Sequence, residues 1–349
     1  MTTLSEAPGV HFEASAFAPR PAEWRGLARD EVRLLVGTPD GISHARFRDL
    51  PEHLRAGDVL VVNNSATVPG ELDATLHDEH VVLHVAARLD GGERVVELRS
   101  APDAARAVLD AQHGDVVRLG VARVTLVGPW PTERGSSPTG QGNRLWRGRV
   151  RGDLDAALAR AGRPIAYGYL DRRYPLSAYQ TVFGTRPGSV EMASAGRPFT
   201  EALVTGLVAR GVAFAPVTLH TGFSSQEAGE APGPEWFEVP EPSARAINAA
   251  RAGGGRVIAV GTTATRALES AVCDGAVVAN AGWTDRVVTP AAPPEVVDGL
   301  ITGWHDPHAS HLLLVEAVAG RALTQAAYDH AVANGYLWHE FGDSALLLP

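Results

Sequence analysis

The 349-residue sequence contains no lysine and a single cysteine, Cys273. One thiol excludes an internal disulfide, and it also excludes a zinc site built from several cysteines. All 31 basic residues are therefore arginine, and the net charge is −9 because the acidic residues number 40. This balance argues against a general nucleic-acid-binding protein, which needs clustered cations to neutralise phosphates, but it leaves room for a local basic patch.

The sequence also lacks an apolar run long enough for a transmembrane helix, and short runs such as Leu312–Val315 are typical of a protein core. The N-terminal stretch MTTLSEAPGVHFEAS has neither a basic start nor an apolar segment, so we expect no signal peptide. The hydrophobic fraction of 45% is ordinary for a globular protein of one large domain or two. We expect a cytoplasmic monomer that contacts no membrane.

Several catalytic signatures are absent as well. The sequence has no Walker A loop, no G-x-G-x-x-G before a helix, no H-E-x-x-H and no G-x-S-x-G. His305, His308 and His311 recur at a three-residue spacing, which permits a metal hypothesis. Because no cysteine or carboxylate completes a metal-binding signature with them, we expect no metal.

Hydrophobic patterning predicts an α/β main domain interrupted by a smaller β-rich insertion. The runs Val32–Val36 and Val59–Val62 indicate strands, and the second is apolar enough to be buried on both faces. Between residues 71 and 150, short alternating runs follow one another, which predicts a small antiparallel barrel or sandwich. We therefore expect a discontinuous main domain, residues 1–70 and 151–349, with residues 71–150 inserted.

The stretch Arg256–Ser270, RVIAVGTTATRALES, predicts a strand, a tight turn and a helix. Val257–Val260 is an unbroken apolar run, Gly261 permits the turn, and the hydroxyls of Thr262 and Thr263 are typical helix caps. A helix N-terminus presents N–H groups and the positive end of a dipole, so it suits a carboxylate or a phosphate. The alternative is an α/β turn that holds no ligand.

Polar residues follow the carboxyl ends of several predicted strands, which is where α/β folds bind their ligands. We expect these groups to build one polar pocket: Asn63 with Asn64, His220, Gly261 to Thr263, His305, and Gly342 with Asp343. For each amide or histidine taken alone, a turn-forming or purely structural role is the alternative.

Taken together, several blocks of the sequence resemble one known family. They are DLPEHLRAGDVLVVNNSATVPGEL, YQTVFGTRPGSVEMASAGRPFTEALVTGLVARGV, VTLHTG, RVIAVGTTATRALES, DGLITGWHDPHAS and YLWHEFGDSALLL. In this order, and over nearly the whole chain outside the insertion, the sequence is similar to the S-adenosylmethionine:tRNA ribosyltransferase-isomerases of queuosine biosynthesis. The resemblance implies an α/β, barrel-like main domain with a smaller inserted antiparallel β-barrel.

The resemblance also implies a reaction that needs no metal and uses S-adenosylmethionine as a co-substrate. Family members transfer its ribosyl part to the aminomethyl group of 7-aminomethyl-7-deazaguanine in tRNA, rearrange it to an epoxycyclopentanediol, and release adenine and methionine. The sulfonium acidifies the C5′ protons, so a base can form an ylide-like carbanion whose collapse expels adenine. Such an enzyme needs a base, an acid for adenine and an unprotonated acceptor amine.

Matching the family's motifs residue by residue implies candidate roles. The resemblance assigns acid–base catalysis to His220, His305, Glu235 and Asp343. Substrate binding falls to Asn63, Asn64, Tyr179, Gln180, Gly196, Gly222, Gly261, Thr262, Thr263 and Arg266. The glycine–threonine turn and Arg266 are expected to hold the methionine carboxylate, and the alternative for Arg266 is a surface pair with Glu269 at i,i+3 spacing.

Other positions depart from the family's pattern. The family's N-N-T-R-V-I-P-A-R block carries Ala66 and Glu71 in place of its two arginines, and its Y-R-F-F-S-Y-G-D block carries Leu337 in place of another. These losses suggest that the chain still uses S-adenosylmethionine as the donor and that the acceptor has changed. Three hypotheses follow: an enzyme acting on tRNA, an enzyme acting on a small-molecule acceptor, and a non-catalytic nucleoside-binding relative.

Overall fold

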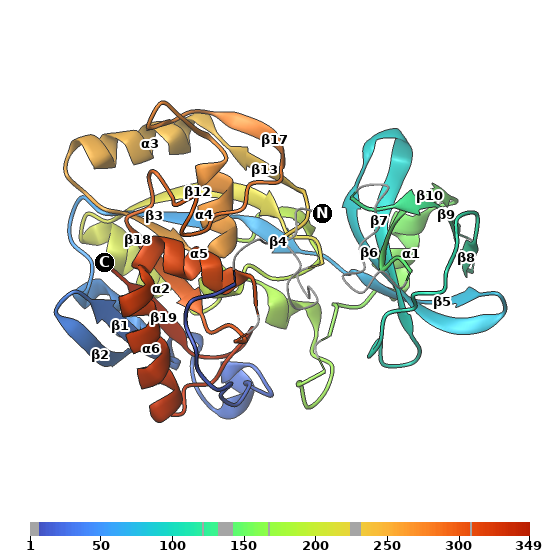
Figure 1. The fold of residues 1–349 in the computed structure, drawn as a ribbon, viewed down its shortest axis with the longest axis horizontal. Helices are drawn as coiled ribbons and strands as arrows, with labels where there is room; N and C mark the ends of the chain where they lie inside the picture. Colours follow the sequence, from blue (N-terminus) through green and yellow to red (C-terminus); the bar gives the residue numbers. More distant parts are fainter. Residues whose placement is uncertain (1–6, 121, 132–141, 167, 224–231, 308) are drawn as a thin grey trace.

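The computed structural model describes residues 7–120, 122–131, 142–166, 168–223, 232–307 and 309–349. A large α/β body lies beside a smaller β-barrel (Figure 1). The chain enters the barrel after β4 (Ser65–Thr67) and leaves it after α1 (Leu154–Ala161). In the described ranges, no helix is long and apolar enough to cross a membrane.

A mixed sheet forms the centre of the main domain. From edge to edge its described strands are β17 (Asn280–Thr284), β13 (Glu235–Val239), β12 (Ala213–His220), β3 (Val59–Asn63), β14 (Val257–Val260), β18 (Gly299–Gly303), β19 (Ser344–Leu347), β1 (Arg33–Thr38) and β2 (Gly41–Arg46). Strands β12, β3, β14 and β18 are parallel, whereas β19 is antiparallel to β18. Every residue of β3 is buried, as its continuous apolar sequence predicts for a central parallel strand.

Helices cover both faces of this sheet. They are α2 (Glu201–Ala209), α3 (Glu241–Ala252), α4 (Thr262–Glu269), α5 (His311–Ala319) and α6 (Arg321–Ala333). Along β3, Val59 and Val61 pack in one apolar layer with α3, α4, α5 and α6, while Leu60 and Val62 face the opposite layer with α2. Because described helices cover both faces, the strand ends are the part of the sheet that a ligand is expected to reach.

Shorter elements connect these layers. The 3-10 turns are Ala22–Arg25, Arg29–Glu31, Phe47–Glu52, Asp90–Gly92, Leu176–Tyr179 and Ser194–Gly196. Strand β4 pairs in parallel with β11 (Arg186–Ser189), and β15 (Val272–Cys273) pairs with β16 (Ala276–Val277). The β4–β11 pair lies where the main domain passes into the barrel, so it fixes the start of the insertion.

The insertion folds into a closed antiparallel barrel. Its described strands are, in order, β10 (Leu145–Arg151), β7 (Glu93–Ser100), β6 (Glu79–Arg88), β5 (Glu71–Leu76), β8 (Val116–Leu119) and β9 (Ala122–Pro129). Alternate side chains such as Leu83, Leu126 and Trp146 fill its interior. The prediction of an α/β main domain with an inserted β-barrel is confirmed, and of the two forms left open for the insertion, barrel or sandwich, the barrel is the one observed.

Helix α1 belongs to the barrel by its packing. Leu154 and Ala157 lie in the same apolar cluster as the interior of the barrel. Asp153 caps the helix, because its carboxylate accepts a hydrogen bond of 2.8 Å from the N–H of Ala156. We therefore propose that the second domain boundary follows α1, rather than lying at residue 151.

A buried charge cluster lies where the barrel meets the main domain. His84 on β6 stands directly opposite Glu71 on β5 and Glu97 on β7, with its ring nitrogens 3.5 and 3.4 Å from their carboxylates. Burial lowers the pKa of His84, but the two carboxylates outweigh burial and raise it. Arg163 and Arg173 pair with Glu71 at 2.9 and 2.7 Å. Glu71, which replaces an arginine of the family's pattern, is thus neutralised inside the molecule.

Candidate active site

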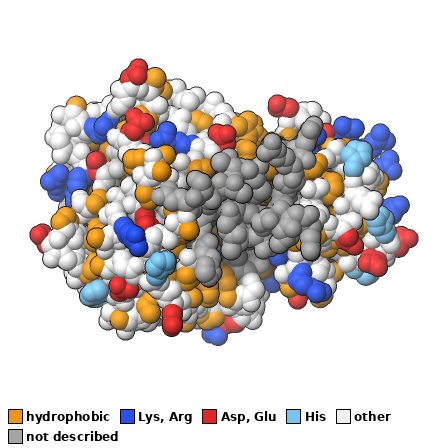
Figure 2. All heavy atoms as spheres, viewed as in Figure 1, with side chains coloured by type: hydrophobic (Ala, Val, Ile, Leu, Met, Phe, Trp, Pro, Cys, Tyr) orange, Lys and Arg blue, Asp and Glu red, His pale blue; other side chains and the backbone are white. Residues whose placement is uncertain are grey.

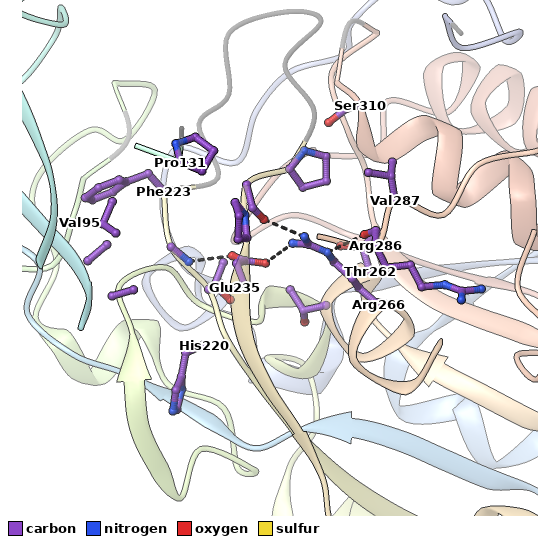
Figure 3. A pocket seen from close by; sticks show the side chains of 18 of the residues that line it. Val95, Pro131, His220, Phe223, Glu235, Thr262, Arg266, Arg286, Val287 and Ser310 are labelled. Atoms are coloured by element: carbon purple, nitrogen blue, oxygen red, sulfur yellow. Dashed lines mark hydrogen bonds and ion pairs between the residues drawn. The ribbon is translucent and has the colours of Figure 1, made fainter. Parts of the chain in front are cut away.

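Two cavities adjoin at the N-terminus of α4, where the central strands end. The first, which we call the junction cavity, lies between the main domain and the barrel (Figure 3). Its lining includes His220, Gly222, Phe223, Glu235, Arg266 and Arg286 from the main domain and Ala86, Ala87, Val95, Trp130, Arg144 and Leu145 from the insertion.

The second cavity, which we call the strand-end cavity, has a volume of about 390 Å³. It is lined by Phe17, Tyr169, Ser194, Ala195, Gly261, Thr302, His305, His339 and Glu340, among other main-domain residues. Thr221, Thr262, Thr263 and His311 line both cavities. Molecules bound in the two cavities would therefore meet at the turn before α4.

The turn before α4 depends on Gly261. This residue has a φ of 92°, and a Cβ placed on it would lie 3.2 Å from the Cβ of Ala195. Gly261 is itself the N-cap, without a side-chain cap, so the predicted capping role of the threonine hydroxyls is wrong. Thr263 instead accepts a hydrogen bond of 3.2 Å from Asn63, and the first N–H groups of the helix are left for a ligand.

Asn63 holds this turn against the neighbouring strand. Its amide nitrogen donates to the carbonyl of Leu219 and to the hydroxyl of Thr263, at 3.0 and 3.2 Å. Its amide oxygen accepts from the N–H groups of Ser65 and Leu219, at 3.0 and 3.1 Å. With two donor and two acceptor contacts made, the side chain has a positioning role at the strand ends.

Glu235 and Arg266 form an ion pair in the wall of the junction cavity, as Figure 3 shows. The carboxylate accepts from Nη1 of Arg266 at 2.6 Å and from the N–H of Gly222 at 2.8 Å. The guanidinium also donates to the carbonyls of Gly233, Thr284 and Arg286. Burial raises the pKa of Glu235, opposed by the Arg266 guanidinium. Arg266 therefore ties three segments together.

His220 is held rigidly at the end of β12. Its Nδ1 lies 2.8 Å from the hydroxyl of Ser65, and its ring stacks on Trp236 with the centroids 5.2 Å apart. A Cβ at position 188 would lie 2.4 Å from the His220 ring, so Gly188 is needed there. Burial and the charge of Arg186 lower the pKa of His220, which keeps its imidazole neutral near pH 7.

Three histidines line the strand-end cavity. The rings of His305 and His311 stack with centroids 4.9 Å apart and planes 6° apart, and Nε2 of His305 lies 3.1 Å from the Thr302 hydroxyl. His339 adopts a φ of 69°, which residues with a side chain seldom do, and its Nδ1 lies 3.0 Å from the Tyr169 hydroxyl. Burial lowers the pKa of His305 well below its ordinary value and that of His311 to about 4.

Glu340 brings a carboxyl group to the same cavity. Its side chain is 11% exposed, and its Oε2 has no hydrogen-bond partner among the described residues. Burial and the nearby Glu191 raise the pKa of Glu340 to about 8, although a hydrogen bond with Ser194 and the charge of Arg197 oppose them. At neutral pH this carboxyl group therefore holds its proton.

Comparisons with known proteins place the chain in one family. The family model described as "Queuosine biosynthesis protein" matches residues 11–347. The chain belongs to this family. A protein of Methylocella silvestris is 37% identical, with 96% of this chain and 95% of that protein covered. One of Thermus thermophilus is 35% identical, with 98% and 99% covered. Both are named S-adenosylmethionine:tRNA ribosyltransferase-isomerase.

A solved structure from the queuosine biosynthesis family also resembles the chain. It is the crystal structure of the S-adenosylmethionine tRNA ribosyltransferase from Thermotoga maritima, with a TM-score of 0.52 and 26% sequence identity. The match covers 95% of this chain and 96% of that chain. The family resemblance derived from the sequence blocks is therefore confirmed over both domains.

The structure brings most of the predicted site residues of this queuosine biosynthesis protein together. His220, Glu235, Gly222 and Arg266 line the junction cavity, Gly261 and His305 line the strand-end cavity, and Thr262 and Thr263 line both. Gly196 follows Ala195, which lines the strand-end cavity. The roles assigned to these residues stay predictions.

Six predicted residues lie outside the linings of both cavities: Asn63, Asn64, Tyr179, Gln180, Gly196 and Asp343. Asn64 and Gln180 are engaged with Thr218 and Thr67, and Tyr179 is buried against Phe341. Asp343, predicted as an acid or base, accepts from the backbone and guanidinium of Arg33 and from the N–H of Leu337. A carboxylate with this many donors is a structural anchor, so the geometry does not favour acid–base work by Asp343.

The surface-pair alternative for Arg266 and Glu269 is wrong. Both side chains are buried, and Glu269 accepts hydrogen bonds from the N–H groups of residues 295–297 instead. Of the predicted histidine cluster, His308 lies outside the described residues. Among the residues that are described, no group of three histidine, cysteine or acidic side chains is placed to hold a metal ion.

Sequence reasoning missed Glu340, His311, His339 and Tyr169 as cavity residues. A signal for Glu340 was present, because it stands where the family's Y-R-F-F-S-Y-G-D block has a serine. A carboxyl group that replaces a hydroxyl in a motif whose Tyr336, Gly342 and Asp343 are kept indicates an altered local function or an altered proton balance.

The free energy of unfolding is expected to fall as pH rises from 7 to about 8.5, more steeply in the wild type than in Glu340→Gln. The raised pKa of Glu340, about 8, means that the folded protein binds this proton more tightly than the unfolded chain. Its contribution is complete below the ordinary carboxyl pKa and is lost as pH passes about 8, so the two slopes should differ by roughly 1 kcal/mol per pH unit. Urea unfolding at several pH values measures both slopes.

The measurement starts at pH 7 because, below that pH, the buried histidines change the free energy of unfolding in the opposite direction. The pKa values of His311 and His339 are lowered to about 4, so their contribution is lost as pH falls below the ordinary histidine value. Equal slopes for the wild type and the variant above pH 7 would contradict a protonated Glu340.

Proposed function

We propose that this chain is an S-adenosylmethionine:tRNA ribosyltransferase-isomerase. It would transfer the ribosyl part of S-adenosylmethionine to the aminomethyl group of 7-aminomethyl-7-deazaguanine in tRNA, rearrange it, and release adenine and methionine. The observation that carries this proposal is the meeting of two cavities at the turn before α4. A donor and an acceptor held in separate cavities can react only where the cavities join. The relatives' names support tRNA over a small-molecule acceptor.

S-adenosylmethionine fits the strand-end cavity. A volume of about 390 Å³ lies within the range of roughly 300–1,000 Å³ of small-molecule sites. The N-terminus of α4 offers N–H groups and a positive dipole end to the methionine carboxylate. Arg266, predicted to share this task, is already held by Glu235 and by backbone carbonyls, so the helix terminus is the better seat.

The base for the C5′ proton is the stacked pair His305 and His311. Both imidazoles are kept neutral by burial, which lowers their pKa values, so each has a nitrogen able to accept a proton. His311 lines both cavities and therefore lies where the sulfonium carbon would face the acceptor. After the proton is removed, the electron pair of the carbanion forms a C4′–C5′ double bond and breaks the bond between C4′ and the ring oxygen. That oxygen then forms a carbonyl group with C1′, and the bond between C1′ and adenine breaks.

The acid for the leaving adenine is Glu340. Expelled adenine carries an extra electron pair on a ring nitrogen and needs a proton. A carboxyl group with a pKa of about 8 holds a proton at neutral pH and can give it up to a more basic nitrogen. Methionine leaves later as a neutral thioether, when the sulfonium takes back its bonding electrons.

The acceptor base enters the junction cavity. Trp130 and Phe223 in its lining give flat apolar surface on which a nucleobase can stack, and Glu235 is a polar group in the same wall. Because this cavity is bounded by both domains, the acceptor nucleotide approaches between them. We also propose that the protein acts as a monomer in the cytoplasm, where tRNA is found.

Product release tests the proposal. Purified protein is incubated with S-adenosylmethionine and a tRNA that carries 7-aminomethyl-7-deazaguanine, and free adenine, free methionine and the modified nucleoside are measured. We expect the three products in equal amounts, and none with a control tRNA that carries guanine at that position. Release of adenine and methionine without RNA would indicate a small-molecule acceptor. No release with any acceptor would refute the proposed enzymatic activity.

A further inference from the structure

Five arginines cover one outer face of the barrel. Side chains alternate along β8, β9 and β10, so that Val117, Val124 and Trp146 point inward and the residues beside them point outward. We call the outward set the arginine row: Arg118, Arg123, Arg147, Arg149 and Arg151. All five are exposed, and arginine side chains gather at the barrel end of the molecule in Figure 2.

The register of the strands sets three of these charges side by side. Arg118 stands directly opposite Arg123, and Arg123 stands directly opposite Arg151. Like charges at directly opposite positions destabilise an antiparallel pair. Within the part of the chain that the structure describes, neither Arg123 nor Arg151 forms an ion pair. Such an arrangement has a cost in stability unless an anion binds to it.

The remaining arginines carry few counter-charges. Arg147 and Arg149 share one carboxylate, that of Glu93, at 3.8 and 3.2 Å. Arg118 lies 3.9 Å from Asp78, whose side chain is 99% exposed and screened by water. Five guanidinium groups thus face two carboxylates, which leaves a local positive charge on a protein whose net charge is −9.

The arginine row leads to the junction cavity. Residues 151, 149 and 147 follow one another along β10, about 7 Å apart, in the direction of Leu145. Arg147 is paired in register with Val95, and both Val95 and Leu145 line the junction cavity. A linear polyanion bound to the arginine row would therefore place one of its neighbouring units in the junction cavity.

We propose that the arginine row binds the phosphate backbone of the RNA substrate and guides it into the junction cavity. This inference rests on the proposed function, which places the acceptor nucleotide in that cavity. A regular spacing of guanidinium groups on a flat strand surface suits a chain of phosphates, each of which can accept a forked hydrogen bond. The row also supplies cations of the kind that are lost at Ala66 and Leu337.

The test compares two charge-matched variants. Arg123→Gln/Arg151→Gln removes the unpaired centre of the row, and Arg48→Gln/Arg245→Gln removes two exposed arginines of the main domain. Binding of a tRNA anticodon stem–loop transcript is titrated at several salt concentrations. We expect the row variant to bind at least about tenfold more weakly and to lower the salt slope by about two, because each lost phosphate contact lowers it by about one.

Two further readouts separate this inference from the proposed function. The affinity for S-adenosylmethionine alone should be unchanged in both variants, and the thermal midpoint of the row variant should not fall, since opposed like charges have been removed. If the wild type releases adenine with modified tRNA but the row variant binds RNA as tightly as the control variant, the row proposal is overturned and the function stands. A wild type that binds no RNA overturns both.

Discussion

Replacing Glu340 with glutamine is expected to slow the release of adenine by about 10²- to 10⁴-fold, the usual contribution of a positioned general acid. The amide keeps the size of the side chain but cannot give a proton to adenine. The binding of S-adenosylmethionine should change little, so the loss should appear in kcat rather than in KM. Steady-state release of adenine at pH 7 measures both.

Two matched variants make this result specific. Glu241→Gln, on the exposed surface of α3, should leave the rate unchanged. Glu191→Gln removes the neighbouring charge that raises the pKa of Glu340, so the alkaline limb of the rate profile should move to lower pH. A full rate in Glu340→Gln would assign the acid to another group.

Replacing Arg266 with glutamine is expected to lower the free energy of unfolding by about 3–5 kcal/mol, the usual cost of breaking a buried ion pair on one side. The change leaves Glu235 without its 2.6 Å partner and removes three hydrogen bonds to backbone carbonyls. Urea unfolding followed by circular dichroism measures the loss.

The double variant Arg266→Gln/Glu235→Gln distinguishes the charge from the packing. With no carboxylate left unpaired, it should recover part of the lost stability, and with the single variant Glu235→Gln it completes the cycle that gives the coupling between the two side chains. Arg245→Gln, whose partner Glu241 is exposed, should cost less than about 1 kcal/mol. An Arg266→Gln variant as stable as this control would mean that the ion pair stabilises nothing.

The strand and helix around the site follow from local sequence. Val257–Val260 is predicted and observed as β14, because four buried apolar residues before a glycine have few other ways to fold. The turn at Gly261 follows from its tolerance of positive φ. The family could be inferred because several such blocks stand in one order along the chain.

Hydrogen-bond partners could not be predicted in this way. Asn63 contacts Leu219 and Thr263, which lie 156 and 200 residues away in the sequence, so only the folded chain shows that its amide is fully used. The same is true of Asp343 and Arg33, 310 residues apart. Motif matching thus found residues near the site without distinguishing anchors from groups that face the cavities.

Two buried acidic residues could not be predicted from the sequence pattern for a different reason. Glu71 opens β5 and is fully buried, which breaks the alternation that the strand follows from Leu72 to Leu76. Glu340 owes its raised pKa first to burial and then to the charge of Glu191, which lies far away in the sequence. A side chain's titration depends on its three-dimensional neighbours, and no local pattern reports them.

The lining of the two cavities has a consequence for the order of events. The strand-end cavity is formed by the main domain alone, whereas the junction cavity needs the main domain and the insertion. In the proposed arrangement, a displacement of the barrel would therefore alter the acceptor's binding site and leave that of S-adenosylmethionine intact. S-adenosylmethionine could then bind whether or not the barrel is in place, whereas the acceptor's site is complete only when both domains are in position.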